Sequence, residues 1–233
     1  MAVHALIPAA GTGRRMGADG NKQYLELGDR PILAHTLTRL AALPCIDALH
    51  VIVADDERSF CSDQVVDRFG LSKVRAVVAG GAERQDSVRN GLVACGAADD
   101  DVVLIHDGVR PFFPAAQIAP LIAAAVANGA ALLAIPAQDT IKEVLDGQVV
   151  RTLERSRLWQ VQTPQAFRFA VIRNAHYRAL EAGFAGTDDA ALVEWCGGKV
   201  AVVTGSPWNF KMTTPADLAL ARALLAAGVL EAF

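Results

Sequence analysis

Residues 6–22 read LIPAAGTGRRMGADGNK, and the rest of the chain is organised around this stretch. The apolar run 3–7, which ends at Pro8, predicts a first buried strand. Closely spaced glycines follow and permit a tight turn, which also carries Arg15 and Lys22. A strand that leads into a glycine-rich turn with cations is typical of a site that binds phosphate through backbone N–H groups and fixed positive charge.

Two known phosphate-binding motifs do not fit this stretch. The P-loop requires Ser or Thr after its lysine, but Gln23 follows Lys22. The dinucleotide motif G-x-G-x-x-G requires a third glycine at position 16, which is Met16, so a dinucleotide-dependent oxidoreductase is disfavoured. Arg15 and Lys22 together favour a reacting triphosphate. The alternative is a tight surface turn with solvated basic residues.

Composition narrows the class of protein. The 233 residues are 52% hydrophobic, which predicts a full core in a single domain over residues 1–233. A net charge of −3 argues against nonspecific nucleic-acid binding. No apolar run reaches the roughly 18 residues of a membrane span, and no leader is evident before the first strand. The four cysteines form no C-x-x-C pair, which favours free thiols and a cytoplasmic protein.

Further apolar runs alternate with segments of helical periodicity. They cover residues 49–53, 74–79, 102–105 and 131–135. This alternation predicts an α/β fold with a doubly wound, mostly parallel sheet. Such sheets bind ligands at the carboxyl ends of their strands, so the loops after the strands are the candidate sites.

The pattern changes after Pro136. Residues 139–144 alternate with a period of two, and Asp146-Gly147 is a typical hairpin-turn dipeptide. We therefore expect a protruding β-hairpin arm over residues 136–157. A two-stranded hairpin is marginally stable alone in water, so we expect this arm to pack on a second subunit.

Several candidate residues follow the predicted strands, each with an alternative interpretation. Asp86 and Ser87 either recognise base and ribose or cap the helix after Gly80-Gly81. Asp107 either binds a magnesium ion together with triphosphate oxygens or forms an ion pair with Arg110. Arg155, at the base of the arm, meets a second anion or is solvated.

Seven motifs occur in order along the chain: PAAGTGRRMG (8–17), GGAERQDSV (80–88), HDGVRP (106–111), DTIK (139–142), LWQVQTPQAF (158–167), TDDA (187–190) and NFKMTTPADL (209–218). Over residues 3–226 the chain resembles the 2-C-methyl-D-erythritol 4-phosphate cytidylyltransferase family of the non-mevalonate isoprenoid pathway. Two departures are visible. Asn21 stands where the family often has proline, and Gly108-Val109 replaces Ala-Ala. We expect no second domain after Phe233, so the resemblance is to the single-function enzyme.

The resemblance implies a nucleotidyltransferase fold and a reaction. CTP and 2-C-methyl-D-erythritol 4-phosphate would give the CDP-alcohol and pyrophosphate by in-line attack on the α-phosphorus. The nearest alternative is a ribitol 5-phosphate cytidylyltransferase. A non-catalytic nucleotide-sensing module is a further alternative, but it predicts the loss of charged site residues, which this sequence retains.

The resemblance also implies roles for individual residues. Catalytic roles fall to Arg15, Lys22, Arg155 and Lys211. The nucleotide would be bound by Pro8, Ala9, Ala10, Gly11, Thr12, Gly13, Gly81, Ala82, Asp86, Ser87 and Gly108. The polyol phosphate would meet Thr140, Arg110 and Thr163, and Asp107 would hold Mg²⁺. The implied assembly is a homodimer in which the arm completes the partner's site, with no nucleic-acid or membrane partner.

Overall fold

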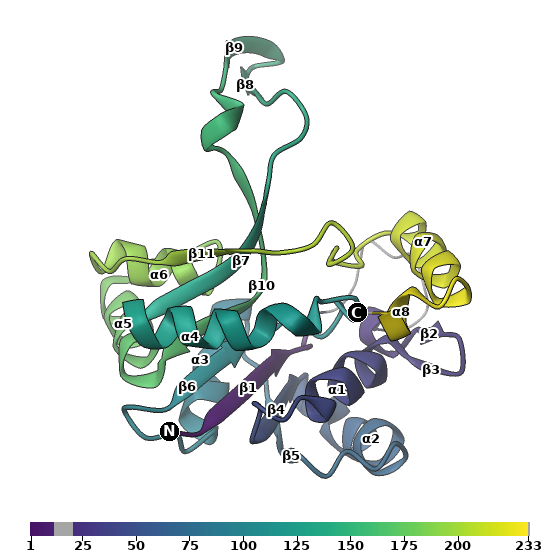
Figure 1. Ribbon diagram of the computed structural model, residues 1–233. Helices are drawn as coiled ribbons and strands as arrows, with labels where there is room; N and C mark the ends of the chain where they lie inside the picture. The colour runs from purple at the N-terminus through teal and green to yellow at the C-terminus, as the bar shows by residue number, and fades with distance from the viewer. Residues whose placement is uncertain (12–20, 233) are drawn as a thin grey trace.

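The fold is built on a seven-stranded sheet, seen in a computed structural model that describes residues 1–11 and 21–232 (Figure 1). The strand order is β11-β7-β10-β6-β1-β4-β5. The strands are β1 (Val3–Pro8), β4 (Ala48–Val53), β5 (Val74–Ala79), β6 (Val102–Ile105), β7 (Ala130–Pro136), β10 (Trp159–Arg168) and β11 (Ala201–Thr204). β10 runs antiparallel to both of its neighbours, and every other pair is parallel. The predicted mostly parallel sheet is confirmed.

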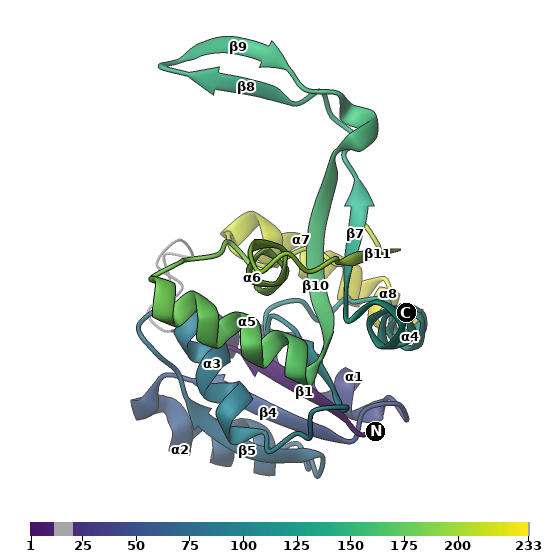
Figure 2. The ribbon, with the colours of Figure 1, turned by 90° about the vertical axis from the view of Figure 1, so that its left-hand side faces the viewer.

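Helices cover both faces of the sheet (Figure 2). The helices are α1 (Ile32–Ala42), α2 (Arg58–Cys61), α3 (Arg84–Ala94), α4 (Ile118–Asn128), α5 (Phe169–Ala182), α6 (Asp189–Trp195), α7 (Pro215–Ala226) and α8 (Val229–Ala232). One core cluster packs α1, α2 and α4 against the face that carries Ala5 and Ile7 of β1. A second packs α3, α5 and α6 against the face that carries Leu6. The alternation of β1 side chains between the two clusters is what a doubly wound sheet requires.

Shorter elements complete the chain. They are η2 (Lys22–Tyr24), β2 (Glu26–Leu27), β3 (Arg30–Pro31), η3 (Asp55–Glu57), η4 (Ser62–Asp67), η5 (Ala115–Gln117) and η6 (Arg155–Arg157). A third apolar cluster packs α7 against Leu27, Ile32 and Phe112. It places the loop before α7 beside the carboxyl end of β6, because Met212 N donates to Val109 O at 3.1 Å.

β10 is a central strand that the sequence pattern did not predict. Its apolar rhythm is interrupted by Gln162 and Gln165, which are buried. Gln162 Nε2 donates to Ser206 O at 2.7 Å, and Gln165 Nε2 donates to Asp188 Oδ2 at 2.7 Å. Because these amides have partners inside the protein, a polar strand can occupy the interior of the sheet.

The predicted hairpin projects from the body of the molecule (Figures 1 and 2). It consists of β8 (Lys142–Leu145) and β9 (Gln148–Thr152), which pair only with each other. Its turn has φ of 50° at Asp146 and 77° at Gly147, the positive pair that a tight hairpin turn requires. All residues of both strands are exposed in the single chain.

Within the described part of the chain, no helix has the length and apolar character needed to cross a membrane.

Candidate active site

A cleft of about 320 Å³ lies at the carboxyl ends of β1 and β6. Four segments that are distant in sequence form its walls: the residues after β1, the turn into α3, the loop after β6 and the loop before α7. It is lined by Pro8, Ala9, Ala10, Gly11, Lys22, Gln23, Gly81, Ala82, Glu83, Arg84, Ser87, Asp107, Val109 and Lys211. Ten of the residues predicted for the site are among them. The position matches the edge at which open α/β sheets bind their ligands.

The turn into α3 is shaped by close backbone packing and by capping. A Cβ on Gly81 would lie 2.3 Å from Asp86 Cβ, so only glycine fits there. Gly81 N donates to Ser87 Oγ at 3.0 Å. Glu83 and Asp86 form a reciprocal capping box, so the capping interpretation of Asp86 holds in this structure. The amino end of α3 therefore faces the cleft, and the helix dipole favours an anion there.

Asp107, in the loop after β6, is the centre of a cluster of charged side chains at the cleft. Its carboxylate is 3.0 Å from Lys211 Nζ, 3.4 Å from Arg84 Nε and 3.4 Å from Arg110 Nε. Burial acts to raise the pKa of Asp107, but the three cations outweigh it and hold the pKa well below its usual range. The Arg110 ion pair left open by the sequence is thus present, as one of three.

Arg84 connects this cluster to a second buried carboxylate. Its Nη1 lies 2.7 Å from Asp189 Oδ2, and Asp189 Oδ1 lies 3.2 Å from His176 Nε2. Burial acts to lower the pKa of Arg84, but Asp189 and Asp107 raise it further, so the guanidinium stays charged. Lys22, Arg84 and Lys211 line the cleft with Asp107 and Glu83, so the lining carries more positive than negative groups.

The loop after β6 is fixed by polar contacts behind the cleft. Thr163 Oγ1 accepts a hydrogen bond from Asp107 N at 3.1 Å. Arg110 Nη1 donates to Asn209 O at 2.6 Å, and His106 Nε2 is 3.0 Å from Arg110 O. Burial lowers the pKa of His106 to about 4, so this imidazole is neutral at physiological pH. His106 therefore orders the loop through its hydrogen bond to Arg110 O.

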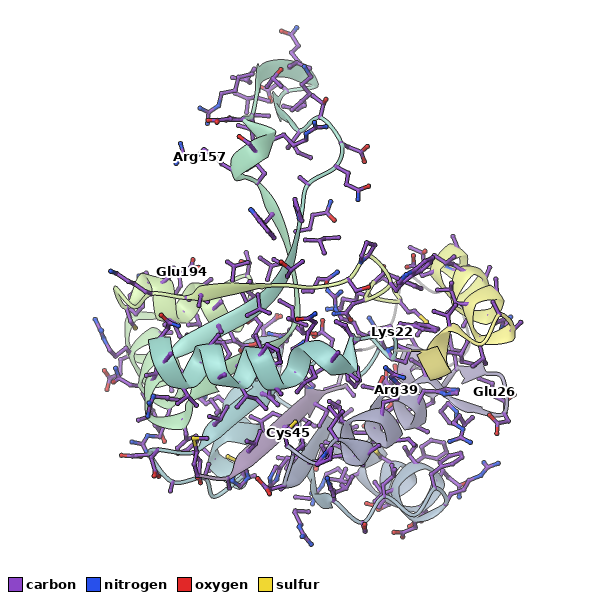
Figure 3. The ribbon with its side chains drawn as sticks, in the orientation of Figure 1. Lys22, Glu26, Arg39, Cys45, Arg157 and Glu194 are labelled. Carbon is purple, nitrogen blue, oxygen red and sulfur yellow. The ribbon has the colours of Figure 1, made fainter. Side chains whose placement is uncertain are left out.

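Other predicted site residues are not among the residues that line the cleft in the described part of the chain. Arg15, Thr12 and Gly13 fall outside the described residues. Gly108 lies beneath the cleft, where a Cβ would be 2.9 Å from Leu33 Cδ1. Thr140 and Arg155 belong to the arm, and Arg155 Nη1 donates to Gln138 O at 2.5 Å. Figure 3 shows that the arm is separate from the body that carries Lys22. Arg157, which belongs to the same short helix as Arg155 (η6), lies on the arm.

Asp107 is also the predicted metal ligand. Among the described residues, no group of three or more His, Cys, Asp or Glu side chains could hold a metal ion. Magnesium commonly takes one or two protein carboxylates and completes its shell with substrate phosphates and water. The buried carboxylate of Asp107 on the cleft wall fits that mode as a single protein ligand.

Sequence reasoning missed several lining residues. Gln23, Glu83, Arg84 and Val109 all line the cleft without having been assigned a role. Arg84 had a usable signal, because it is a cation in the first turn of the helix that follows the Gly80-Gly81 pair. Asp189 had none, since its contact with Arg84 joins α6 to α3 across the fold.

A doubly wound sheet whose carboxyl edge carries a cleft lined by three cations and by the amino end of a helix is typical of a nucleotide-binding protein. The family model described as 2-C-methyl-D-erythritol 4-phosphate cytidylyltransferase matches residues 3–227. The chain belongs to this family, and it is an enzyme that transfers a cytidylyl group from CTP to 2-C-methyl-D-erythritol 4-phosphate. The expected family is confirmed, and the main prediction is favoured over ribitol 5-phosphate.

Individual relatives agree over nearly the full length. The chain is 58% identical to the 2-C-methyl-D-erythritol 4-phosphate cytidylyltransferase of Syntrophotalea carbinolica, with 97% of each chain covered. It is 55% identical to that of Geotalea uraniireducens, again with 97% of each covered. Among solved structures, the 4-diphosphocytidyl-2C-methyl-D-erythritol synthase of Anaerococcus prevotii superposes with a TM-score of 0.84 at 33% identity, covering 97% of this chain and 96% of that one.

Proposed function

We propose that the cleft binds CTP and that its cations promote attack of the polyol phosphate on the α-phosphorus. A phosphate oxygen of 2-C-methyl-D-erythritol 4-phosphate forms the new bond to the α-phosphorus. The bond from that phosphorus to the oxygen bridging the β-phosphate breaks, and pyrophosphate leaves with the electron pair. Because a phosphate dianion is already nucleophilic, the protein supplies position and charge and needs no general base.

The convergence of cations on one cleft carries this proposal. Lys22, Arg84 and Lys211 reach it from three separate segments of the chain. In this arrangement Lys22 stabilises the charge that develops on the α-phosphate and on the leaving pyrophosphate. Lys211 binds the phosphate of the incoming alcohol. Arg15 shares the role of Lys22, on the basis of the family motif alone.

The nucleotide cradle follows from the same lining. Backbone groups of the segment 8–11 and of Gly81 and Ala82 bind the cytidine and its phosphates, with Ser87 beside them. Residues with short side chains at Ala9, Ala10 and Gly11 let the backbone approach a ligand closely. Asp86 acts through its capping of α3.

Asp107 would hold Mg²⁺, which supplies charge neutralisation to the triphosphate when it is bound. The Asp107 carboxylate, which lies 3.0 Å from Lys211 Nζ, would then interact with both the lysine and the ion. The buried carboxylate supports this role because it is already ionised at physiological pH.

The functional unit is a homodimer in which Thr140 and Arg155 act on the partner's substrate. Exposure of the arm supports this assembly. Val144, Leu145, Val149 and Val150 are each more than half exposed in the single chain, which is costly for apolar side chains of a hairpin. The cytoplasm is the compartment we propose, supported by four free cysteines.

A substrate panel tests the proposed function. Purified protein is incubated with CTP and Mg²⁺, and pyrophosphate release is measured with 2-C-methyl-D-erythritol 4-phosphate and with ribitol 5-phosphate. We expect rapid release with the first alcohol and a kcat/KM lower by at least about 10²-fold with the second. Equal or faster release with ribitol 5-phosphate would overturn the substrate assignment.

A further inference from the structure

Lys22 lies in a short segment whose two sides are tied to one acidic side chain. Asn21 Nδ2 donates to Glu57 Oε1, directly before Lys22. On the other side, Gln23 Nε2 donates to Glu57 Oε2 at 3.2 Å, and Tyr24 Oη donates to the same oxygen at 3.3 Å. Both carboxylate oxygens of Glu57 are thus used on the residues that flank Lys22.

Glu57 is well placed to act as an anchor because it belongs to the frame of the cleft. It closes the short helix η3, where Glu57 N donates to Ala54 O at 3.0 Å directly after β4. The end of β4 is in turn bonded to the nucleotide loop, since Ala9 N donates to Ile52 O at 2.7 Å. A carboxylate held by this frame keeps the Lys22 segment in register with the backbone that cradles the nucleotide.

The Asn21–Tyr24 segment that Glu57 contacts is also ordered by its own backbone hydrogen bonds. Residues 22–24 form the one-turn helix η2, in which Tyr24 N donates to Asn21 O at 2.9 Å and Leu25 N donates to Lys22 O at 3.2 Å. Burial, with Cys61 and Glu57 adding to it, raises the pKa of Tyr24 far above its usual range, so the phenol keeps its proton and donates. The Tyr24 ring also meets the Phe60 ring edge-on at 4.9 Å, which fixes the side chain from the other side.

We propose that Glu57 is a positioning residue for Lys22, holding the Asn21–Tyr24 segment so that the ammonium group meets the reacting phosphates. This inference rests on the role proposed above for Lys22. It also gives a physical reason for Asn21. Where a proline would stiffen the backbone directly, this chain has an asparagine whose side chain binds the Glu57 carboxylate.

The backbone angles at Asn21 allow a proline to replace the asparagine and its hydrogen bond to Glu57 in a test. The φ of Asn21 is −76° and its ψ is 130°, both of which proline adopts without strain. A proline at this position would restrict the segment without help from Glu57. Asn21→Pro should therefore compensate for the loss of Glu57.

Steady-state kinetics on a set of variants tests the proposal. Glu57→Ala should lower kcat by roughly 10–100-fold, as expected when a catalytic group is misplaced by about an ångström, with the KM for CTP changed by less than about threefold. In the Lys22→Ala background, Glu57→Ala should cost less than about a further twofold, because its effect acts through the missing lysine. Asn21→Pro added to Glu57→Ala should restore roughly 3–10-fold of the lost kcat.

Controls separate positioning from folding. Asp56→Ala removes an exposed neighbouring acid of the same short helix and should leave kcat unchanged. Glu57→Gln keeps the size of the side chain and one acceptor oxygen, so it should fold and give an intermediate loss of kcat, with thermal unfolding checked for every variant.

Each failure identifies its own cause. Wild-type turnover in Lys22→Ala refutes the proposed role of Lys22. An impaired Lys22→Ala enzyme beside wild-type turnover in Glu57→Ala overturns the inference about Glu57 alone. A full additional loss from Glu57→Ala in the Lys22→Ala background also overturns it, because Glu57 would then act independently of the lysine.

Discussion

Lys211 Nζ lies 3.0 Å from Asp107 Oδ2, which links the loop before α7 to the end of β6 at the cleft. The lysine is about one-third exposed at 36%, whereas the aspartate side chain is 8% exposed. The carboxylate is therefore the fixed partner, and the ammonium group can turn to an entering phosphate. When Lys211 turns to the phosphate, Arg84 and Arg110 continue to neutralise the Asp107 carboxylate.

Lys211→Ala should raise the KM for 2-C-methyl-D-erythritol 4-phosphate by roughly 10–100-fold, the value of one charged hydrogen bond to a phosphate. The KM for CTP should change much less, because the lysine is assigned to the alcohol. Lys199→Ala is the matched control, since Lys199 is an exposed lysine away from the cleft lining. A larger effect on CTP than on the alcohol would reverse the assignment.

Lys22→Ala should lower kcat by about 10²–10³-fold, which is typical for the loss of one preorganised charge contact in a transition state. Its thermal unfolding should stay close to that of the wild type, because the side chain is only partly buried. Turnover and unfolding are measured on the same preparation. Unimpaired turnover would show that the cation acts on neither the α-phosphate nor the pyrophosphate.

His106 should make the protein less stable in acid. Its pKa is about 4 in the folded protein, against about 6.5 in the unfolded chain. Between these values the unfolded state binds a proton that the folded state does not, so stability falls as the pH drops from 6.5 to 4. The loss attributable to His106 is on the order of 3 kcal/mol.

Denaturant unfolding of His106→Gln at pH 7 and pH 4 isolates this contribution, since the amide does not titrate and is able to donate to Arg110 O. The variant should lose less stability than the wild type over that range. The comparison is needed because burial also lowers the pKa of His50 to about 4, and His50 is unchanged in both proteins. An identical loss in both proteins would mean that His106 is not held neutral.

The fold was predictable wherever apolar runs were unbroken. The strands β1, β4 and β6 are buried along most or all of their lengths, so their sequences carry a plain apolar signal. β10 escaped prediction because glutamines interrupt it, and their partners, Ser206 and Asp188, are distant in sequence. Pairing of that kind depends on the finished fold and leaves no local pattern.

The features of the candidate site also fall into those that the sequence indicated and those that depend on the finished fold. Glycine-rich turns at the ends of strands pointed to Gly11, Gly81 and Asp107, since the ends of parallel strands meet at one edge. The sequence did not show that Asp107 has three cationic partners, or that Arg84 joins it to Asp189. Likewise, the anchoring of Lys22 by Glu57 depends on η2 and η3 lying side by side, which no spacing rule predicts.

Mixing two inactive variants should restore activity if the arm completes the partner's site. In a heterodimer of Lys22→Ala and Arg155→Ala, one site combines an intact body with an intact arm. After full subunit exchange at equal amounts, half of the dimers are mixed, so about a quarter of wild-type activity is expected. Mixing Lys22→Ala with Lys211→Ala is the control, assayed with 2-C-methyl-D-erythritol 4-phosphate well below the KM of Lys211→Ala, because both changes lie in the body and every site keeps one lesion. Recovery in the control as well, or in neither mixture after verified exchange, would argue that Arg155 does not act across the dimer.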